Sequence, residues 1–81
     1  MLNLSIIEES GKYTSAEVES VTIPSVKGRF TVFPNHAPIM CVVVPGEVQY
    51  VKKGGDSKER YPVRGGVARI ENNNIMLCLE Q

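Results

Sequence analysis

Glycine and proline are spread along the whole chain, and they leave little room for a helix. Only two stretches of more than ten residues lack both, Lys12–Ile23 and Val67–Gln81. The first is rich in Val, Ile and Thr, and the second is interrupted by three consecutive asparagines. No stretch shows a sustained apolar period of about 3.6 residues. Short apolar runs separated by turn residues are typical of strands, so we predict an all-β chain.

Alternation of apolar and polar residues supports this prediction. Leu2, Leu4 and Ile6 alternate with Asn3 and Ser5, as expected when successive side chains point to opposite faces of a sheet. Strands buried on one face usually pair antiparallel. Their short, regular spacing predicts a mostly antiparallel β-sandwich rather than an α/β fold. The predicted strands are Leu2–Ile7, Tyr13–Ser15, Val18–Ile23, Gly28–Phe33, Ile39–Val44, Glu47–Lys52, Glu59–Arg64, Gly66–Ile70 and Ile75–Leu79.

Two of these strands, Ile39–Val44 and Ile75–Leu79, are apolar on both faces. We therefore predict that they lie centrally in a sheet or beneath another layer. Pro45-Gly46 suits the central positions of a type II turn. Lys53-Gly54-Gly55-Asp56 and Asn72-Asn73-Asn74 have the residues of hairpin tips.

Size and charge exclude several functional classes. The 81 residues predict one domain, 1–81. Nine Lys and Arg balance nine Asp and Glu, whereas a nucleic-acid binder normally carries a basic excess. We therefore predict no nucleic-acid partner. The longest dense apolar run, Ile39–Val44, is far too short to cross a membrane. The two cysteines, Cys41 and Cys78, are interpreted as buried, reduced thiols because their neighbours are apolar. The alternative is a disulfide between them, which requires that they lie on facing strands.

Residues that carry chemistry are scarce. His36 is the only histidine, and neither cysteine belongs to a CxxC pair, so we predict no metal site, no cofactor and no catalytic centre. Nothing near Cys41 activates its thiol for nucleophilic catalysis. The most informative segment is Asn35-His36-Ala37, which Pro34 and Pro38 bracket. Two prolines stiffen this loop, which is either a docking feature or a purely structural corner.

An ordered set of residues gives the chain a resemblance to a known family. It comprises Gly28-x-Phe30-x-Val32-x-Pro34-x-His36-Ala37-Pro38, then Pro45-Gly46, then Gly65-Gly66. With these features the chain resembles the epsilon subunit of F-type ATP synthases over essentially its whole length. It departs from the family at Tyr13–Val18, which has an extra residue and no glycine, so we expect a different bend or bulge there. It also departs at Arg69, where the family often has an acid.

The resemblance implies a fold and a role. The family's N-terminal domain is a ten-stranded sandwich, so we expect an antiparallel β-sandwich of about ten short strands. The subunit is not an enzyme by itself. It clamps the gamma subunit to the c ring at the foot of the central stalk, and it couples proton-driven rotation to ATP synthesis. Many relatives continue into a C-terminal helical hairpin, for which these residues have no counterpart.

The resemblance also implies where the partners bind. The c ring is expected to contact the loop formed by Ser25, Val26, Lys27, Gly28 and Arg29. The gamma subunit is expected to contact Glu8 and the segment formed by His36, Ala37, Pro38, Ile39, Met40 and Cys41. The alternative to a partner contact for Arg29 is a loop cation that faces solvent. The alternative for His36 is an imidazole that packs at a structural corner.

The implied location is peripheral, on the cytoplasmic face of the inner (plasma) membrane, which the chain contacts only through the c ring. A second interpretation is an autonomous cytosolic β-sandwich module that binds other proteins through an exposed strand edge.

Overall fold

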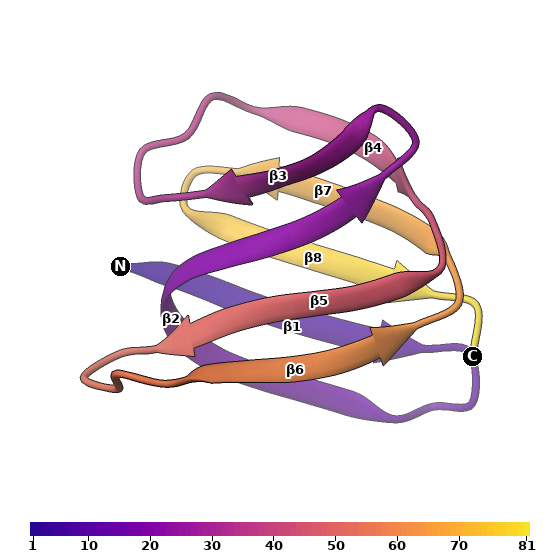
Figure 1. Cartoon of the computed structure of the whole chain (residues 1–81), viewed down its shortest axis with the longest axis horizontal. Coiled ribbons are helices and arrows are strands. Elements are labelled where there is room, and N and C mark those ends of the chain that lie inside the picture. The colour runs from indigo at the N-terminus through magenta and orange to yellow at the C-terminus, as the bar shows by residue number, and fades with distance from the viewer.

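The computed structural model describes residues 1–81 and contains strands but no helix, which confirms the all-β prediction (Figure 1). The eight strands are β1 (Leu2–Glu8), β2 (Tyr13–Ser25), β3 (Gly28–Val32), β4 (Ile39–Val43), β5 (Gly46–Lys52), β6 (Lys58–Val63), β7 (Gly66–Glu71) and β8 (Asn74–Leu79). Nine strands were expected from the pattern and about ten from the resemblance. The difference arises partly because the predicted strands Tyr13–Ser15 and Val18–Ile23 are one continuous strand, β2.

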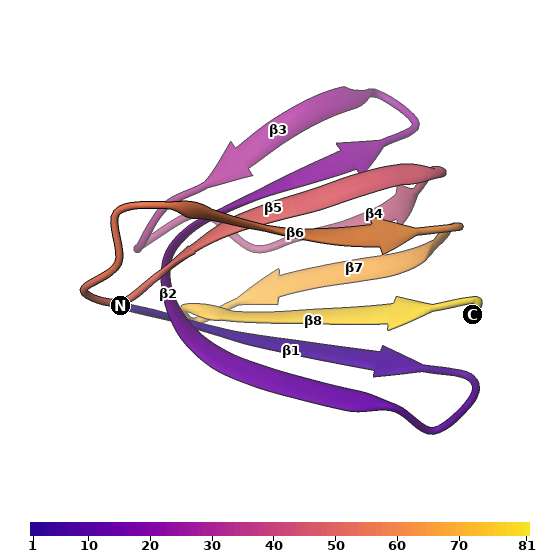
Figure 2. The same ribbon diagram turned by 60° about the horizontal axis from the view of Figure 1, so that its bottom comes forward.

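The long strand β2 takes part in both layers of a sandwich. Its first half pairs with β1, and its second half pairs with β5 and β3. One layer therefore contains β1, β8, β7 and β4, and the other contains β3, β5 and β6 (Figure 2). All strand pairs are antiparallel except β1 with β8. The predicted mostly antiparallel sandwich is thus confirmed.

A bulge explains how β2 serves both layers. The register between β2 and β5 shifts between Val18 and Ser20. Val18 and Val21 are both fully buried although they are three residues apart. Side chains alternate along a regular strand, so an odd separation on one face requires an extra residue, and a bulge also bends the strand. The bulge lies just after the segment where the sequence departs from the family pattern.

The core fills the space between the two layers. Each large aliphatic side chain buried there contributes about 1.5–3 kcal/mol relative to an exposed one. The cluster consists of sixteen side chains: Leu2, Leu4, Ile6, Val18, Val21, Ile23, Val32, Val43, Val48, Tyr50, Val63, Ala68, Ile70, Ile75, Leu77 and Leu79.

The two strands with apolar residues on both faces have different surroundings. Strand β8 lies between β1 and β7, as predicted. Strand β4 lies between β7 and β2 in the sheet order, so the prediction for Ile39–Val44 is confirmed only in part. It pairs with β7 along its length but with β2 only near Ser25 and Val43, and no layer covers its outer face. One face of β4 is open to solvent, where Met40 is 69% and Val42 is 53% exposed.

The predicted turns are partly confirmed. Asn72 and Asn73 have φ of 51° and 62° and form the two-residue tip of the β7–β8 hairpin, which matches a type I′ turn. Residues 53–57 connect β5 with β6 as a hairpin, which includes the predicted tip 53–56. Pro45-Gly46 instead carries the chain from β4 in one layer to β5 in the other. The φ of Gly46 is 158°, far from the value near +80° that a type II turn requires.

The sandwich has two sides at which the edges of its layers face each other, and these sides differ. On one side Tyr61 of β6 donates a hydrogen bond to the Glu8 carboxylate at the end of β1. The Gln81 side chain donates to the Pro62 carbonyl (2.9 Å) and accepts from the Arg64 amide (2.8 Å), so this side is closed. On the other side the edges of β3 and β4 leave a groove.

Candidate protein-binding surface

A groove lies between the edges of β3 and β4 and has a volume of about 640 Å³. Strand β3 pairs only with β2, so its other edge faces the groove. Most of the lining is apolar, as in many binding sites. The lining residues are Ser25, Val26, Lys27, Gly28, Arg29, Phe30, Ile39, Met40, Cys41, Val42 and Val67.

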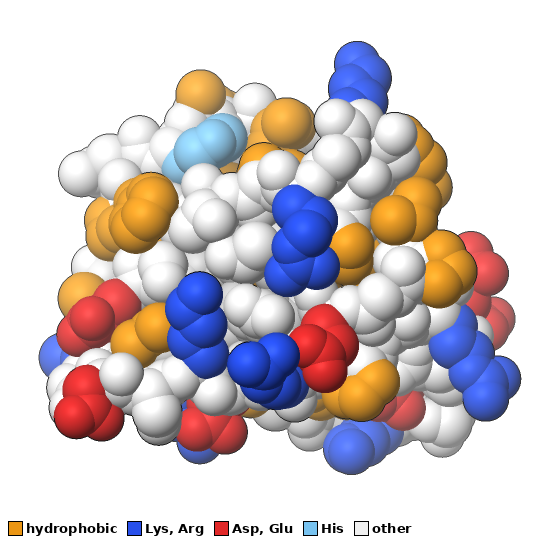
Figure 3. Space-filling view, in the orientation of Figure 1, with side chains coloured by type: hydrophobic (Ala, Val, Ile, Leu, Met, Phe, Trp, Pro, Cys, Tyr) orange, Lys and Arg blue, Asp and Glu red, His pale blue; other side chains and the backbone are white.

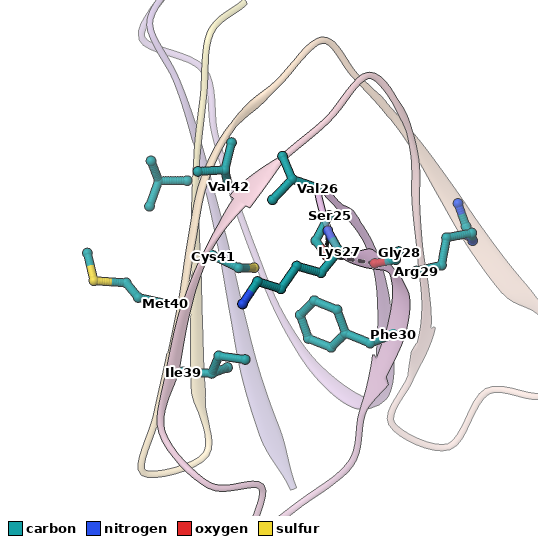
Figure 4. A pocket seen from close by; sticks show the side chains of 11 residues that line it. Ser25, Val26, Lys27, Gly28, Arg29, Phe30, Ile39, Met40, Cys41 and Val42 are labelled. Atoms are coloured by element: carbon teal, nitrogen blue, oxygen red, sulfur yellow. Dashed lines mark hydrogen bonds between the residues drawn. The ribbon is translucent and has the colours of Figure 1, made fainter.

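The groove brings together two segments that were assigned to different partners. The residues Ser25 to Arg29, which were expected as a loop at the c ring, are the β2–β3 turn and the strand ends beside it, and they form one wall. Ile39, Met40 and Cys41, expected at gamma, form the other. Figure 4 shows Phe30 pointing into the groove and Lys27 reaching across it toward the β4 side. A partner seated on one wall therefore borders the other.

The wall from Ser25 to Arg29 is held in one shape. The Ser25 hydroxyl is buried, donates to the Gly28 carbonyl (2.6 Å) and accepts from the Lys27 amide (3.2 Å). Arg29 points away from the groove and donates to the Glu47 carbonyl at 3.3 Å. Lys27 forms no ion pair, so its ammonium is free for a partner.

The segment expected at gamma alternates between two surfaces. Ile39 and Cys41 point into the groove, whereas Met40 points to the other side of β4 (Figure 4). His36 is half-buried, and its Nδ1 lies 2.7 Å from the Ala37 carbonyl oxygen. The imidazole is therefore engaged within its own loop.

Glu8 does not join this surface. The strand register places Glu8 beside Leu79, Leu79 beside Gly66, and Gly66 beside Val43, so Glu8 lies three strands from β4. Its carboxylate accepts hydrogen bonds from the Tyr61 and Ser10 hydroxyls. The Tyr61 bond lowers the pKa of Glu8 from its usual value, although removal from water opposes this effect. The structure gives Glu8 a role in closing the sandwich.

A second apolar surface was missed from the sequence. We call it the outer face, the solvent side of β4, β7, β8 and β1. Cross-strand neighbours Val42, Val67, Cys78 and Ile7 form a continuous row on it. Val67 is 42% and Met76 is 45% exposed. Exposed apolar rows of this kind mark contact surfaces. The only signal was the apolar character of both faces of Ile39–Val44 and of Ile75–Leu79, which we interpreted as burial within the chain.

The surface of the other layer has a different character. Figure 3 shows basic and acidic side chains side by side over β5 and β6. One ion pair lies there, Arg60 with Glu47 at 3.1 Å, and a second joins Lys53, just after β5, to Glu17 of β2 at 3.6 Å. Such mixed charge is typical of a solvated face. The outer face, by contrast, carries a single ion pair, Arg69 with Glu71 at 3.3 Å, beside its apolar row.

Comparison with known protein families identifies the family to which the chain belongs. The family described as ATP synthase, Delta/Epsilon chain, beta-sandwich domain, matches residues 1–81. The chain belongs to this family. No three His, Cys, Asp or Glu side chains of this family member lie close enough to ligate a metal. No helix in it could cross a membrane.

Curated relatives carry the name ATP synthase epsilon chain. The relative from Herpetosiphon aurantiacus is 34% identical over 79 residues, which cover 98% of this chain and 57% of the relative. The relative from Mesorhizobium japonicum is 48% identical over 66 residues, covering 82% of this chain and 48% of the relative. The chain thus spans about half the length of these relatives.

Two solved structures share the fold. One is the Euglena gracilis mitochondrial ATP synthase (OSCP/F1/c-ring), with a TM-score of 0.84 and 20% identity over 99% of this chain and 51% of that one. The other is the Tetrahymena thermophila mitochondrial ATP synthase central stalk and c ring, with a TM-score of 0.82 and 9% identity over 99% and 63%. They support the sandwich assignment for this member of the delta/epsilon family.

The two cysteines of this delta/epsilon-family domain lie on opposite faces of one layer. Cys41 is opposite the buried Ala68, whereas Cys78 is opposite the exposed Val67. Strand β7 separates them by two strand spacings, about 10 Å, which is too far for a disulfide. Burial raises the pKa of the Cys41 thiol.

We therefore expect iodoacetamide at pH 8 to alkylate Cys78 roughly tenfold faster than Cys41, because Cys78 is exposed and Cys41 forms less thiolate. Peptide mass spectrometry over a time course measures both rates, and the urea-unfolded chain should show equal rates. Equal rates in the native chain, or an internal disulfide after mild oxidation, would contradict this geometry.

Proposed function

We propose that this chain is a non-catalytic rotor subunit of an F-type ATP synthase, which joins the gamma subunit to the c ring. The observation that carries the proposal is the family match over the whole chain. A groove supports it, since Ser25–Arg29, expected at the c ring, forms one wall and Ile39–Cys41, the end of the segment expected at gamma, forms the other. The role requires no active site. It requires a stiff body with two adjoining contact surfaces, because torque passes through it.

The fold supplies such a body. The long strand β2 crosses from one layer to the other, and 49 backbone hydrogen bonds tie the 81 residues together. Packed protein interiors deform little under load. Rotation imposed at one surface therefore reaches the other with little loss.

Gamma fits the apolar side of the molecule. Ile39 and Cys41 in the groove adjoin Met40 and Val42 on the outer face, so one partner can cover β4 from both sides. Burial of apolar side chains such as these drives most stable protein association. His36 and its loop border this surface.

The c ring fits the loop from Ser25 to Arg29. Lys27 and Arg29 give this loop a positive charge, which suits acidic or carbonyl groups on a polar loop of the ring. An exposed pair of this kind contributes about 0–1 kcal/mol. The subunit would then sit on the cytoplasmic face of the inner membrane and reach the lipid only through the ring.

Binding to the separate partners tests the proposal. We expect the chain to form a one-to-one complex with purified gamma from the same source, measured by calorimetry. Arg29→Glu should weaken binding to a gamma–c-ring complex by roughly three- to tenfold, because it reverses a charge at the ring. Lys58→Glu, a matched reversal on the polar layer, serves as the control.

The same titrations can contradict the proposal. Binding to neither gamma nor the gamma–c-ring complex at about 50 µM would exclude a stable stalk contact. It would favour an autonomous module that takes an extended peptide between the open edges of β3 and β4. An unchanged affinity of Arg29→Glu would remove only Arg29 from the contact.

A further inference from the structure

All five asparagines of the chain gather at one corner of the molecule, although they are scattered in three parts of the sequence. They connect the start of β1, the loop 33–38 between β3 and β4, and the β7–β8 hairpin. They are Asn3, Asn35, Asn72, Asn73 and Asn74.

Asn73 is the centre of this corner. Its backbone carbonyl accepts a hydrogen bond from the Asn3 amide at 2.9 Å. Its side-chain Oδ1 accepts one from the Asn35 amide at 2.6 Å. The φ values of Asn73 and Asn35 are 62° and 67°, so both residues adopt the left-handed conformation that asparagine tolerates better than most residues. One side chain thus serves both a tight turn and a long-range contact.

The loop 33–38 depends on this contact. Between the end of β3 and the start of β4, the Asn35–Asn73 bond is the only hydrogen bond from the loop to another part of the chain. The remaining one, between His36 and Ala37, is local. Phe33 is largely exposed, so packing holds the loop weakly. Without the Asn73 side chain, the two prolines would still stiffen the loop, but no hydrogen bond would fix its orientation relative to the β7–β8 hairpin.

We propose that Asn73 is a positioning residue for partner binding: its side-chain carbonyl holds the His36 loop against the β7–β8 hairpin, in the position at which gamma is recognised. This inference rests on the proposed function. It also connects the loop to the outer face, because the same hairpin carries Met76 and Cys78 in β8. A hairpin tip needs only a left-handed residue there, whereas the loop needs the carbonyl.

Two glycine variants distinguish the requirement for a left-handed backbone from the requirement for a side-chain carbonyl. Asn73→Gly keeps the left-handed backbone but removes the carbonyl, and Asn72→Gly makes the same change one residue earlier, where the side chain does not contact the loop. We expect Asn73→Gly to speed hydrogen exchange at the Asn35 amide about fivefold and to weaken gamma binding roughly three- to tenfold. Asn72→Gly should change neither, and Asn73→Asp should restore both, because it returns an acceptor oxygen.

Each outcome decides the inference. If Asn73→Gly and Asn72→Gly behave alike in both measurements, Asn73 acts only as a turn residue and the inference is wrong. If exchange at Asn35 rises while gamma affinity stays unchanged, the loop is positioned but is not recognised, and the inference is also wrong. If the wild-type chain binds neither gamma nor the gamma–c-ring complex, the proposed function fails, whereas the exchange of Asn35 still reports whether Asn73 holds the loop.

Discussion

Replacing Gly66 with alanine is expected to destabilise the fold by about 3–5 kcal/mol, most of the stability of a domain of this size. A Cβ at Gly66 would lie 2.0 Å from the Cys78 carbonyl oxygen and 2.9 Å from the Leu79 Cα. Both are backbone atoms of β8, a central strand that cannot move without disturbing β1 and β7. The φ of Gly66 is 145°, where side chains are strained even in open space.

Urea unfolding followed by circular dichroism measures this effect. Gly54→Ala is the matched control, because Gly54 also has a positive φ (76°) but a Cβ added there would meet no atom within 4 Å. It should cost only about 1 kcal/mol, the penalty of the backbone alone. Similar midpoints for the two variants would show that β8 yields to the extra methyl group.

The Gly65-Gly66 pair is evident in the sequence, but the reason why glycine is required at Gly66 is not. Glycine before a strand indicates a turn or a close approach, and the sequence alone does not distinguish them. The close approach at Gly66 arises because the end of β8 lies beside the start of β7, where Gly66 is paired with Leu79. The hairpin tip at the asparagines indicates that these two residues pair, but the distance between their backbones depends on the three-dimensional structure.

The alternation of residues predicted most strands well, since each strand of a sandwich buries one face. It failed at β2, which is one continuous strand where two, Tyr13–Ser15 and Val18–Ile23, were predicted, and in which Val18 and Val21 break the alternation. The bulge that reconciles them becomes evident only when β5 is placed beside β2. Local pattern cannot identify an extra residue whose purpose is to move a strand between layers.

The candidate site was predicted in pieces. The resemblance indicated Ser25–Arg29 and His36–Cys41, but only the structure shows that the first and the end of the second line one groove. The structure also places Glu8 three strands away from β4, outside this groove. The outer face was missed because the sequence alone does not distinguish an apolar residue that binds another protein from one that is buried within its own chain.

A charge at the centre of the outer face is expected to have the largest effect on partner binding. Val67→Asp should weaken gamma binding by about 100-fold or more, because association would bury a carboxylate beside Val42 and Cys78, and the one cation near it on β7, Arg69, is already paired with Glu71. Val67 is 42% exposed in the free chain, so the variant should still fold. Calorimetry measures the affinity, and thermal unfolding confirms that the fold is retained.

Gln49→Asp is the control for this variant, since Gln49 lies on β5 between the buried Val48 and Tyr50 and therefore faces the solvent on the polar layer. It places the same new charge on a strand without touching the outer face, and gamma affinity should stay within about twofold. If binding is driven by apolar burial, the wild-type reaction should also show a negative heat-capacity change and little dependence on salt. Equal affinities of Val67→Asp and Gln49→Asp would place gamma elsewhere and leave the groove as the remaining candidate. A loss confined to Val67→Asp would mean that the exposed apolar row is the surface on which this domain holds its partner.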